Sequence, residues 1–540
     1  MGIQAELISL FGEINYFSER GIHVLNMSSQ NLLNDMRLLK EQLRFNLLLD
    51  VCGVDNSERE SQSGSRFEVV YHLLNMSTHE RLRVRVPIDI EEVVPSVVSI
   101  WKGASWFEKE AWDMFGIEFE AQSKERILTH SEFVGHALRK DFDFSVEQKV
   151  ASAKVEDLHT EESAIVGRPR LKNWVNLSTK HPGNYGLLKT MVEVQAERIT
   201  NAKVDIGFLH RGIEKLSESR PYSQISLFTD RLNYSSAPMN SIGWCKAVEE
   251  LLNIEIPDRA KAMRMVVAEF SRVMDHLLCI AYLAKEVGAI SAYQICIEER
   301  EKIGQLFEEF GGSRQGFNLI KIGGLANKLS SGWIGMAMET LTSTQNCLLM
   351  IDQFLTRTQG WIRRTKVSSV SAKDAISWGY TGPCLRASGV NYDIRKVTPY
   401  YFYEDVDFEV PLGVNGECYD RYLVRLEEVR QSLGIIGQVP DHLPTGLMLS
   451  DDPLINCVDK NLVYSDKDAL KKHHDQIINN IAPEKAEIYS CSEVANGELG
   501  FYLISNGEQS PYRLKVRAPS FSIIQSFPEV VIGNELMDAT

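Results

Sequence analysis

The feature that most constrains the fold of this chain is a long stretch of apolar residues at helical spacing that begins near Asp258. Charged and polar residues interrupt this stretch at Glu269, Arg272, Asp275 and His276. A membrane span needs roughly 18 nearly continuous apolar residues, so the interruptions predict a long helix packed in a protein core instead. Aspartate commonly caps helix starts, and we expect the helix to begin at Asp258. The apolar positions of the pattern are Met263, Val266, Val267, Phe270, Val273, Met274, Leu277, Ile280, Ala281 and Ala284.

The first part of the chain has the pattern of a small α+β domain, which we place at residues 1–145. Strands are predicted at residues 45–54, 66–76 and 81–88. In the last of these, RLRVRVPI, apolar residues alternate with arginines, which predicts a half-buried strand paired in a hairpin. An apolar helix or turn is expected over residues 90–101. Residues 146–172 are charged and weakly periodic, and we interpret them as a linker.

The remaining part, residues 173–540, is predicted to be a second, mainly helical domain with strands at both ends. It opens with the strand-like runs WVNLST and KTMVEVQAERI. Besides the helix from Asp258, helices are predicted at residues 291–310, 333–362 and 417–437. A closing hairpin is expected from residues 497–505 and 511–519, which are separated by a short loop that contains glycine. The predicted fold class of the chain is therefore α+β.

Composition excludes several classes of function. The net charge of −15 argues against nucleic acid as a partner and against direct binding to anionic lipid. None of the nine cysteines forms a CxxC pair, so we expect no metal or iron–sulfur cluster to be held by this chain alone. No GxGxxG follows a predicted strand, which argues against a bound NAD. The start of the chain lacks the basic region of a secretory signal.

Two segments of the first domain carry a resemblance to a known family. Residues 106–117, WFEKEAWDMFGI, read as an amphipathic helix that ends at Gly116. They also resemble the signature of the 30 kDa subunit of complex I, which is the C-type component of the bacterial enzyme. Residues 135–141, GHALRKD, look like the same family, which usually has proline at the position of Ala137.

The second domain is similar to the 49 kDa subunit of complex I, the D-type component, and through it to the large subunit of nickel–iron hydrogenases. The similarity is carried by four segments, which are residues 205–216 (DIGFLHRGIEKL), 230–234 (DRLNY), 381–396 and 413–422. The two resemblances cover nearly the whole chain, and they imply a fused C/D subunit with a hydrogenase-like second domain. The hydrogenase CxxC pairs that would bind nickel and iron are absent, which argues against hydrogenase activity.

The resemblance implies a set of site residues. Tyr234 matches the tyrosine placed at the quinone headgroup, and a phenol is a suitable hydrogen-bond donor to a quinone oxygen. Arg211 matches an arginine beside the terminal iron–sulfur cluster. His181 begins the segment HPGNYG, in which Tyr185 stands where the family has a quinone-binding histidine. Glu286 stands where the family has an aspartate that partners this histidine. We expect Tyr185, Tyr234 and Glu286 to converge on one cavity.

The implied function is a peripheral-arm subunit of a proton-translocating NADH–quinone oxidoreductase. Quinone is the expected substrate, the iron–sulfur clusters and FMN are expected in partner subunits, and the isolated chain is expected to be inactive. Expected partners are the cluster-bearing subunit of the quinone module, other peripheral-arm subunits and membrane-arm subunits. The expected location is the cytoplasmic side of the bacterial inner membrane, held there peripherally.

A rival hypothesis remains open at this point. Tyr185 and Glu286 depart from the family pattern, and Gly316 stands where the family has a histidine near the terminal cluster. Tyrosine has a reference pKa near ~10, against ~6.5 for histidine, and is a poorer proton carrier at neutral pH. The chain could therefore be a non-redox scaffold subunit that has lost quinone chemistry, and Tyr234 and Arg211 oppose that interpretation.

Overall fold

The structure is a computed structural model, and it describes most of the chain. The described residues are 2–59, 64–143, 145, 147–148, 174–177, 188–326, 329–439, 443–455, 458, 460–478 and 481–539. They divide into two compact units. The first comprises Met1–Gly212, Ser377–Gly379 and Ser522–Thr540, and the second comprises Ile213–Ile376 and Tyr380–Phe521. The α+β fold class is confirmed, since both helices and several sheets are present.

The first unit contains a five-stranded sheet with the order β1-β2-β5-β4-β3. Its strands are β1 (Tyr16–Glu19), β2 (Ile22–Asn26), β3 (Leu47–Asp55), β4 (Phe67–Leu74) and β5 (Arg81–Ile88). The strands predicted at 45–54, 66–76 and 81–88 correspond to β3, β4 and β5, and the hairpin of β4 and β5 is antiparallel. Other elements described here include α1 (Ile3–Phe11), α2 (Leu32–Glu41), β6 (Val93–Val94), α3 (Ala104–Phe115) and β7 (Glu118–Phe119).

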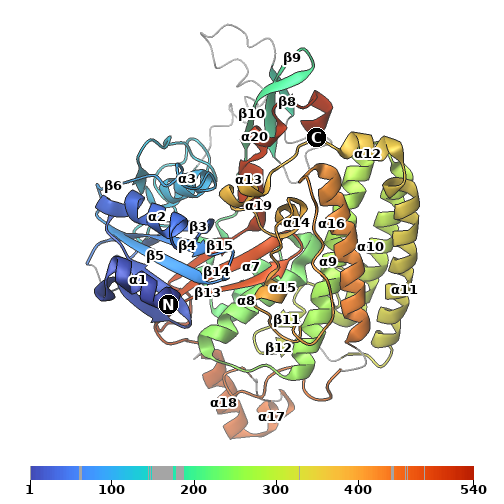
Figure 1. Cartoon of the computed structure of the whole chain (residues 1–540). Coiled ribbons are helices and arrows are strands. Elements are labelled where there is room, and N and C mark those ends of the chain that lie inside the picture. Colours follow the sequence, from blue (N-terminus) through green and yellow to red (C-terminus); the bar gives the residue numbers. More distant parts are fainter. Residues whose placement is uncertain are drawn as a thin grey trace. The chain divides into compact units, whose positions relative to one another are not determined.

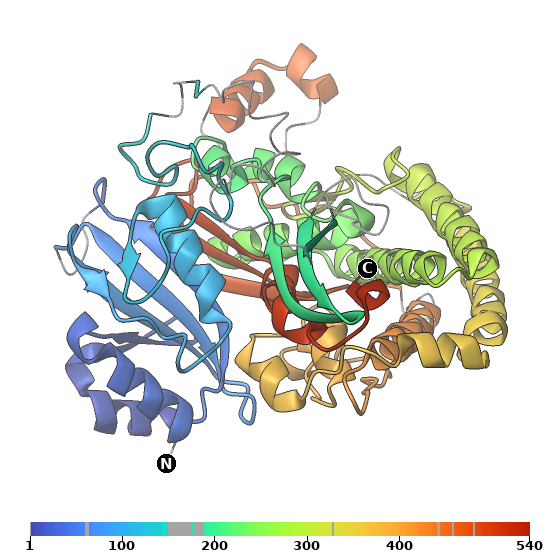
Figure 2. The same cartoon turned by 90° about the horizontal axis from the view of Figure 1, so that it is seen from above.

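Helix α3 corresponds to the predicted amphipathic helix and packs against β3. Figure 2 shows it in light blue, lying across the blue strands of the sheet. It ends at Gly116, whose φ of 74° is the left-handed conformation common after a helix. Residues 90–101, predicted as a helix or a turn, form β6 and turns. The prediction that β5 is half-buried is wrong, because Arg83 and Arg85 are buried too. Arg85 lies inside because Glu68 of β4 pairs with it, with 3.2 Å between Nη2 and Oε2.

A second, three-stranded sheet completes the first unit, in the order β10-β9-β8. Its strands are β8 (Trp174–Leu177), β9 (Lys189–Gln195) and β10 (Arg198–Asp205). Two residues with positive φ, Ala196 and Glu197, turn β9 into β10, where a single strand over KTMVEVQAERI was expected. The sheet packs on α20 (Phe527–Val531) and η6 (Leu536–Ala539). Nearly all of the predicted linker lies outside the described residues, so it stays a prediction.

The second unit is built on four long helices that lie side by side (Figure 1). They are α9 (Asp258–Glu286), α10 (Ile290–Gly311), α11 (Trp333–Ile351) and α16 (Cys418–Gln438). Helix α9 packs on α10 and α16, and α11 closes the group by packing on the same two. The predicted long helix is confirmed, but Pro257 rather than Asp258 occupies the N-cap position. The helix predicted at 333–362 is interrupted, because α11 passes into a π-helical segment (Asp352–Thr356) before α12 (Gln359–Thr365).

The rest of the second unit surrounds these helices. The antiparallel sheet of β13 (Ala486–Val494), β14 (Gly497–Ser505) and β15 (Arg513–Arg517) contains the predicted closing hairpin, and β13 was not predicted. Helix α8 (Ala237–Leu252) packs on β13 and α9. Other elements that belong to this unit, in whole or in part, are α6 (Ile213–Ser217), α7 (Tyr222–Thr229), η3 (Tyr234–Ser236), β11 (Ile320–Lys321), β12 (Gly324–Leu325), α13 (Ala372–Ser377), α14 (Gly382–Ala387), α15 (Ile394–Val397), α17 (Lys460–Ser465), α18 (Lys467–Ile478) and α19 (Pro519–Gln525).

Candidate functional site

Tyr234 lies in a short 3₁₀ turn, η3, that enters α8. The turn is fixed to α9 by the carboxylate of Asp275, since Asn233 Nδ2 and Ser236 Oγ both donate to Asp275 Oδ2, at 2.6 and 3.1 Å. Asn233 also caps the turn by accepting from the backbone N–H of Ser235 at 3.2 Å. The Tyr234 side chain itself is 57% exposed. A rigidly held backbone therefore presents an exposed phenol.

The hydrogen bonds of Asp275 continue to two other elements of the second unit. Asn496, in the turn between β13 and β14, donates from Nδ2 to Asp275 Oδ1 at 3.4 Å. Arg425 of α16 donates from Nη2 to Asn496 Oδ1 at 3.4 Å and from Nε to Cys279 Sγ of α9 at 3.2 Å. We call Asn233, Asp275, Cys279, Arg425 and Asn496 the polar rim. Arg425, Cys279 and Asn496 are half-buried, so the rim lies at the border of the interior.

A cavity of about 370 Å³ lies beside α10. It is lined by Arg300, Glu301, Gly304, Ser313, Arg314 and Gln315. Burial lowers the pKa of Arg300, while the nearby Tyr282, Asp275 and Tyr234 act in the opposite direction. Tyr234 thus shares its surroundings with a cation and a carboxylate.

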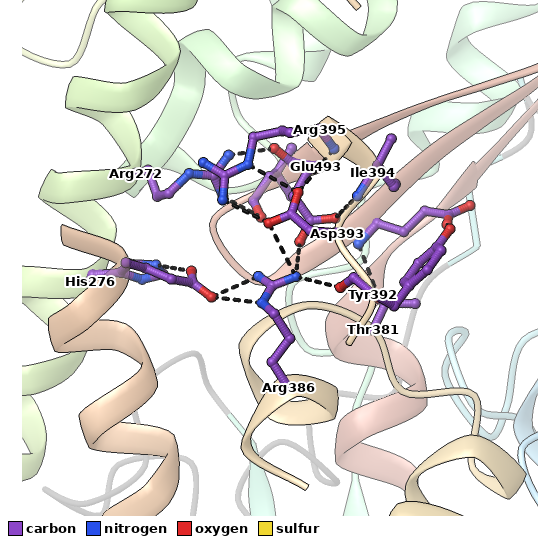
Figure 3. Close-up of polar contacts among 12 residues, drawn as sticks. Arg272, His276, Thr381, Arg386, Tyr392, Asp393, Ile394, Arg395 and Glu493 are labelled. Carbon is purple, nitrogen blue, oxygen red and sulfur yellow. Dashed lines mark hydrogen bonds and ion pairs between the residues drawn. The ribbon is translucent and has the colours of Figure 1, made fainter. Parts of the chain in front are cut away.

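Behind the polar rim, eight ionisable side chains form a buried charge cluster (Figure 3). Its members are Glu269, Arg272 and His276 of α9, Arg386 of α14, Asp393 and Arg395 at α15, Glu428 of α16 and Glu493 of β13. The residues of α9 are three and four positions apart, so they share one face of the helix. Seven members of the cluster are acids or arginines. Each of these seven lies within ion-pair distance of a member that can carry the opposite charge.

Arg386 is central to the cluster. Its Nη2 lies 2.7 Å from Glu428 Oε1, and its Nη1 lies 2.9 Å from Glu493 Oε1. The other oxygen of Glu428 is 2.8 Å from His276 Nε2. Burial lowers the pKa of His276 more than the contact with Glu428 raises it. The cluster thereby connects α9, α14, α16 and β13 in the interior.

The carboxylates of the cluster differ in their affinity for protons. Burial by itself raises the pKa of Glu269, but Arg272 and Arg395 reverse this effect and bring it to about 2. Arg386 in the same way holds the pKa of Glu428 well below its usual range, against the effect of burial. Burial and the neighbouring Asp393 instead raise the pKa of Glu493 to about 7. Within the cluster, Glu493 can therefore carry a proton near neutral pH.

The structure places the predicted site residues in different parts of the chain. Tyr234 and Glu286 belong to the second unit and Arg211, exposed, to the first. Glu286 is the last residue of α9 and lies eleven positions after Asp275, which is about 16 Å along a helix. His181 and Tyr185 lie outside the described residues. The predicted convergence of Tyr185, Tyr234 and Glu286 therefore stays a prediction.

Gly316, where the family resemblance implies a histidine, lies in the loop after α10. Its φ is 72°, and a Cβ placed on it would lie 2.7 Å from Cγ of Pro238. The local backbone thus requires glycine.

The sequence prediction missed the polar rim and the buried charge cluster. A signal was present, because the charged residues in the stretch after Asp258 lie inside an apolar pattern, where an ion needs a partner. Glu269, Arg272, Asp275 and His276 are these residues, and each takes part in the rim or the cluster. Their partners on α14, α16 and β13 could not be read from the pattern of one helix.

Two absences apply to the described residues. Among them no helix is long and apolar enough to cross a lipid bilayer. Within the same part of the chain, no group of three or more His, Cys, Asp or Glu side chains is arranged to hold a metal ion.

Comparison with known proteins accounts for both parts of the chain. Residues 25–148 match the family described as respiratory-chain NADH dehydrogenase, 30 Kd subunit, and residues 286–540 match the 49 Kd subunit of the same enzyme. The C/D subunit of NADH-quinone oxidoreductase from Bdellovibrio bacteriovorus is 43% identical over 524 residues, which cover 96% of this chain and 92% of that protein. The chain belongs to the family of fused C/D subunits of NADH-quinone oxidoreductase.

Two further relatives support the assignment to this C/D family. The C/D subunit of the same enzyme from Methylococcus capsulatus is 32% identical over 538 residues, covering 96% of this chain and 92% of that protein. The D-type subunit from Myxococcus xanthus is 39% identical over 384 residues, covering 71% of this chain and 92% of that protein. The expectation of a complex I subunit of the respiratory chain is confirmed.

Proposed function

We propose that this C/D subunit helps to form the quinone-reduction site of a proton-translocating NADH–quinone oxidoreductase, beside a terminal iron–sulfur cluster held by a partner subunit. The observation that carries the proposal is the exposed Tyr234 phenol on a turn that Asp275 fixes to α9. A binding group must be held in place by its surroundings if it is to select one geometry of the ligand. Tyr234 has this property although its ring is exposed.

The chemistry of the reaction fits the groups around Tyr234. Reduction of a quinone consumes two electrons and two protons and converts each carbonyl oxygen into a hydroxyl. The Tyr234 O–H can donate a hydrogen bond to one carbonyl oxygen, and this bond strengthens as negative charge develops there. Arg300 adds positive potential close to this group. The electrons would come from NADH through flavin and clusters in partner subunits.

The remaining residues of the proposal are those of the resemblance. Tyr185 and Glu286 would complete the catalytic group, and His181 and Arg211 would contact the quinone and the neighbourhood of the cluster. We also propose that the partners are the cluster-bearing subunit together with further peripheral-arm and membrane-arm subunits. The subunit would lie on the cytoplasmic side of the bacterial inner membrane, held peripherally, and would be inactive by itself.

The test is Tyr234→Phe in the assembled complex, with Tyr464→Phe as the matched control. Tyr464 is 79% exposed on α17, so the same hydroxyl is removed from another exposed tyrosine. We expect Tyr234→Phe to lower the rate of quinone reduction by about 100-fold, the lower end for loss of a positioned proton donor. Reduction of ferricyanide, which takes electrons ahead of the quinone site, should not change in either variant.

The alternative is a non-redox scaffold, and the same assay separates the two. A wild-type complex that reduces ferricyanide but no quinone would establish the scaffold role. If the wild-type complex reduces quinone and Tyr234→Phe matches Tyr464→Phe, Tyr234 is not the headgroup donor.

A further inference from the structure

The cavity beside α10 is lined by polar side chains, apart from one glycine. Its lining residues come from the second half of α10 and from the loop directly after it, and they are Arg300, Glu301, Gly304, Ser313, Arg314 and Gln315. Its volume of about 370 Å³ is in the range of small-molecule sites, about 300 to 1,000 Å³. Such sites are mostly apolar, so this lining suits a polar, charged ligand instead.

The lining holds two cations and one anion. Arg300 and Arg314 both contact the carboxylate of Glu301. Burial lowers the pKa of Arg300, and the guanidinium of Arg314 lowers it further. Asp275 acts on Arg300 in the opposite direction, but it is not part of the lining. A second anion in the cavity would therefore stabilise both guanidinium groups.

Arg300 has little hydrogen bonding of its own. Among the described residues its ion-pair contact is with Glu301, where 3.6 Å separates Nη1 from Oε1, a distance too long for a hydrogen bond. Its enclosed Nε has no acceptor in the same part of the chain. The side chain is 14% exposed and lines the cavity, so a ligand inside the cavity can reach the guanidinium. Ser313 adds a hydroxyl and Gln315 an amide NH₂ to the lining.

The loop that carries three of the lining residues is held against α10. The backbone N–H of Gly316 donates to the carbonyl of Ser313 at 2.9 Å, which closes a turn around Arg314. On α10, a Cβ placed on Gly304 would lie 3.3 Å from the carbonyl oxygen of Arg314, so the glycine lets the loop lie close to the helix. A loop that is already ordered binds a ligand without the entropy cost of ordering it.

We propose that this cavity binds a phosphate group between Arg300 and Arg314. A phosphate group carries a charge of about −1.5 to −2 at neutral pH and presents three strong acceptor oxygens. Guanidinium, hydroxyl and amide donors on different sides of the cavity can serve these oxygens together. A carboxylate has two oxygens and needs only one arginine fork. The inference is independent of the proposed function, because it concerns binding by this chain and not quinone reduction.

The experiment titrates the purified full chain with inorganic phosphate by calorimetry at pH 7.5, with the ionic strength held constant by sodium chloride. We expect one phosphate per chain. Arg300→Gln and Arg314→Gln should each weaken this binding by about tenfold or more, from the value of a hydrogen bond to a charged group. The matched control is Arg357→Gln, which should bind as the wild type does. Arg357 is 78% exposed and pairs with Asp352 at 3.5 Å, outside the lining.

The source of the phosphate group is distinguished by a second titration of the wild-type chain with glycerol 3-phosphate. Tighter binding of the ester than of inorganic phosphate supports a small phosphate monoester, which uses the rest of the cavity. Equal or weaker binding of the ester supports free phosphate.

A further measurement uses the wild-type chain alone and does not depend on the variants folding. Phenylglyoxal modifies accessible guanidinium groups, and the Arg314 side chain is 55% exposed. We expect inorganic phosphate to slow the modification of Arg314 several-fold relative to Arg357, as followed by mass spectrometry of peptides. Sodium acetate at the same ionic strength should leave the ratio of the two unchanged.

Three results would overturn the inference. One is a ratio of Arg314 to Arg357 modification that phosphate does not change. Another is an Arg300→Gln chain that binds phosphate as the Arg357→Gln chain does. The third is equal protection of Arg314 by acetate, which would mean that the cavity does not select phosphate. The proposed function stands in all three cases, because none of them measures quinone reduction.

Discussion

Glu493 and Glu428 allow a matched test of the buried charge cluster. Both are fully buried and both pair with Arg386, yet their pKa values move in opposite directions. At pH 6 Glu493 should carry a proton while Glu428 is ionised. Replacement of Glu428 by glutamine removes the closest ionised partner of the buried Arg386 and leaves it only the more distant Asp393 carboxylate at 3.6 Å, which costs about 3–5 kcal/mol. Replacement of Glu493 by glutamine keeps the charge of the folded state and should cost less than about 1 kcal/mol.

The assay is thermal unfolding of the purified chain, followed through the transition of the second unit. For a unit of roughly 300 residues, a loss of about 3–5 kcal/mol lowers Tm by roughly 5–8 °C. We therefore expect this drop for Glu428→Gln and a shift of less than about 2 °C for Glu493→Gln at pH 6. Equal losses in the two variants would refute the reasoning, since they would mean that Glu493 is ionised at pH 6.

The same pair predicts a pH dependence. In the unfolded chain Glu493 releases its proton near its ordinary pKa of 4.5, and in the folded chain it does so near 7. The folded state thus binds more protons within this window, and stability falls as pH rises through it, by about 3 kcal/mol. Glu493→Gln lacks this dependence. Its Tm relative to the wild type should rise by roughly 5 °C between pH 4.5 and pH 8.

Two further predictions concern the backbone. Gly316→Ala should lower the free energy of unfolding by about 1–3 kcal/mol, because φ is 72° and the new Cβ would lie 2.7 Å from Pro238. Calorimetry checks this, with Gly335→Ala as the control, since Gly335 lies in a helix and has open space around it. Limited proteolysis should first cut within residues 146–172, the predicted linker, and a first cut inside β4 or β5 would oppose that division of the chain.

The parts of the fold that could be predicted are those set by local periodicity. Strand β5 and helices α9 and α16 follow from alternation and from apolar spacing, so their bounds were close. The burial of Arg85 could not be predicted, since it depends on Glu68 of another strand. The break after α11 also has no local signal, because the residues of the π-helical segment continue an ordinary helical pattern.

The site shows the same limit more strongly. Tyr234 was identified through family resemblance, because an isolated tyrosine has no distinguishing pattern. The polar rim joins residues as far apart as Asn233 and Asn496, and the cluster joins Glu269 to Glu493. Such contacts depend on how helices and strands pack, and no periodicity within one element encodes them. Only the charged residues inside the apolar stretch of α9 indicated that polar partners were needed there.

The central claim is that this C/D subunit works in a quinone-reducing complex. The most direct measurement is to isolate the complex from membranes through an affinity tag on this chain and to assay NADH oxidation with a quinone analogue. We predict that the chain copurifies with an iron–sulfur subunit and that the preparation reduces quinone with NADH. A chain that is isolated without an iron–sulfur partner, or a complete complex that oxidises NADH with ferricyanide but never with quinone, would contradict the account.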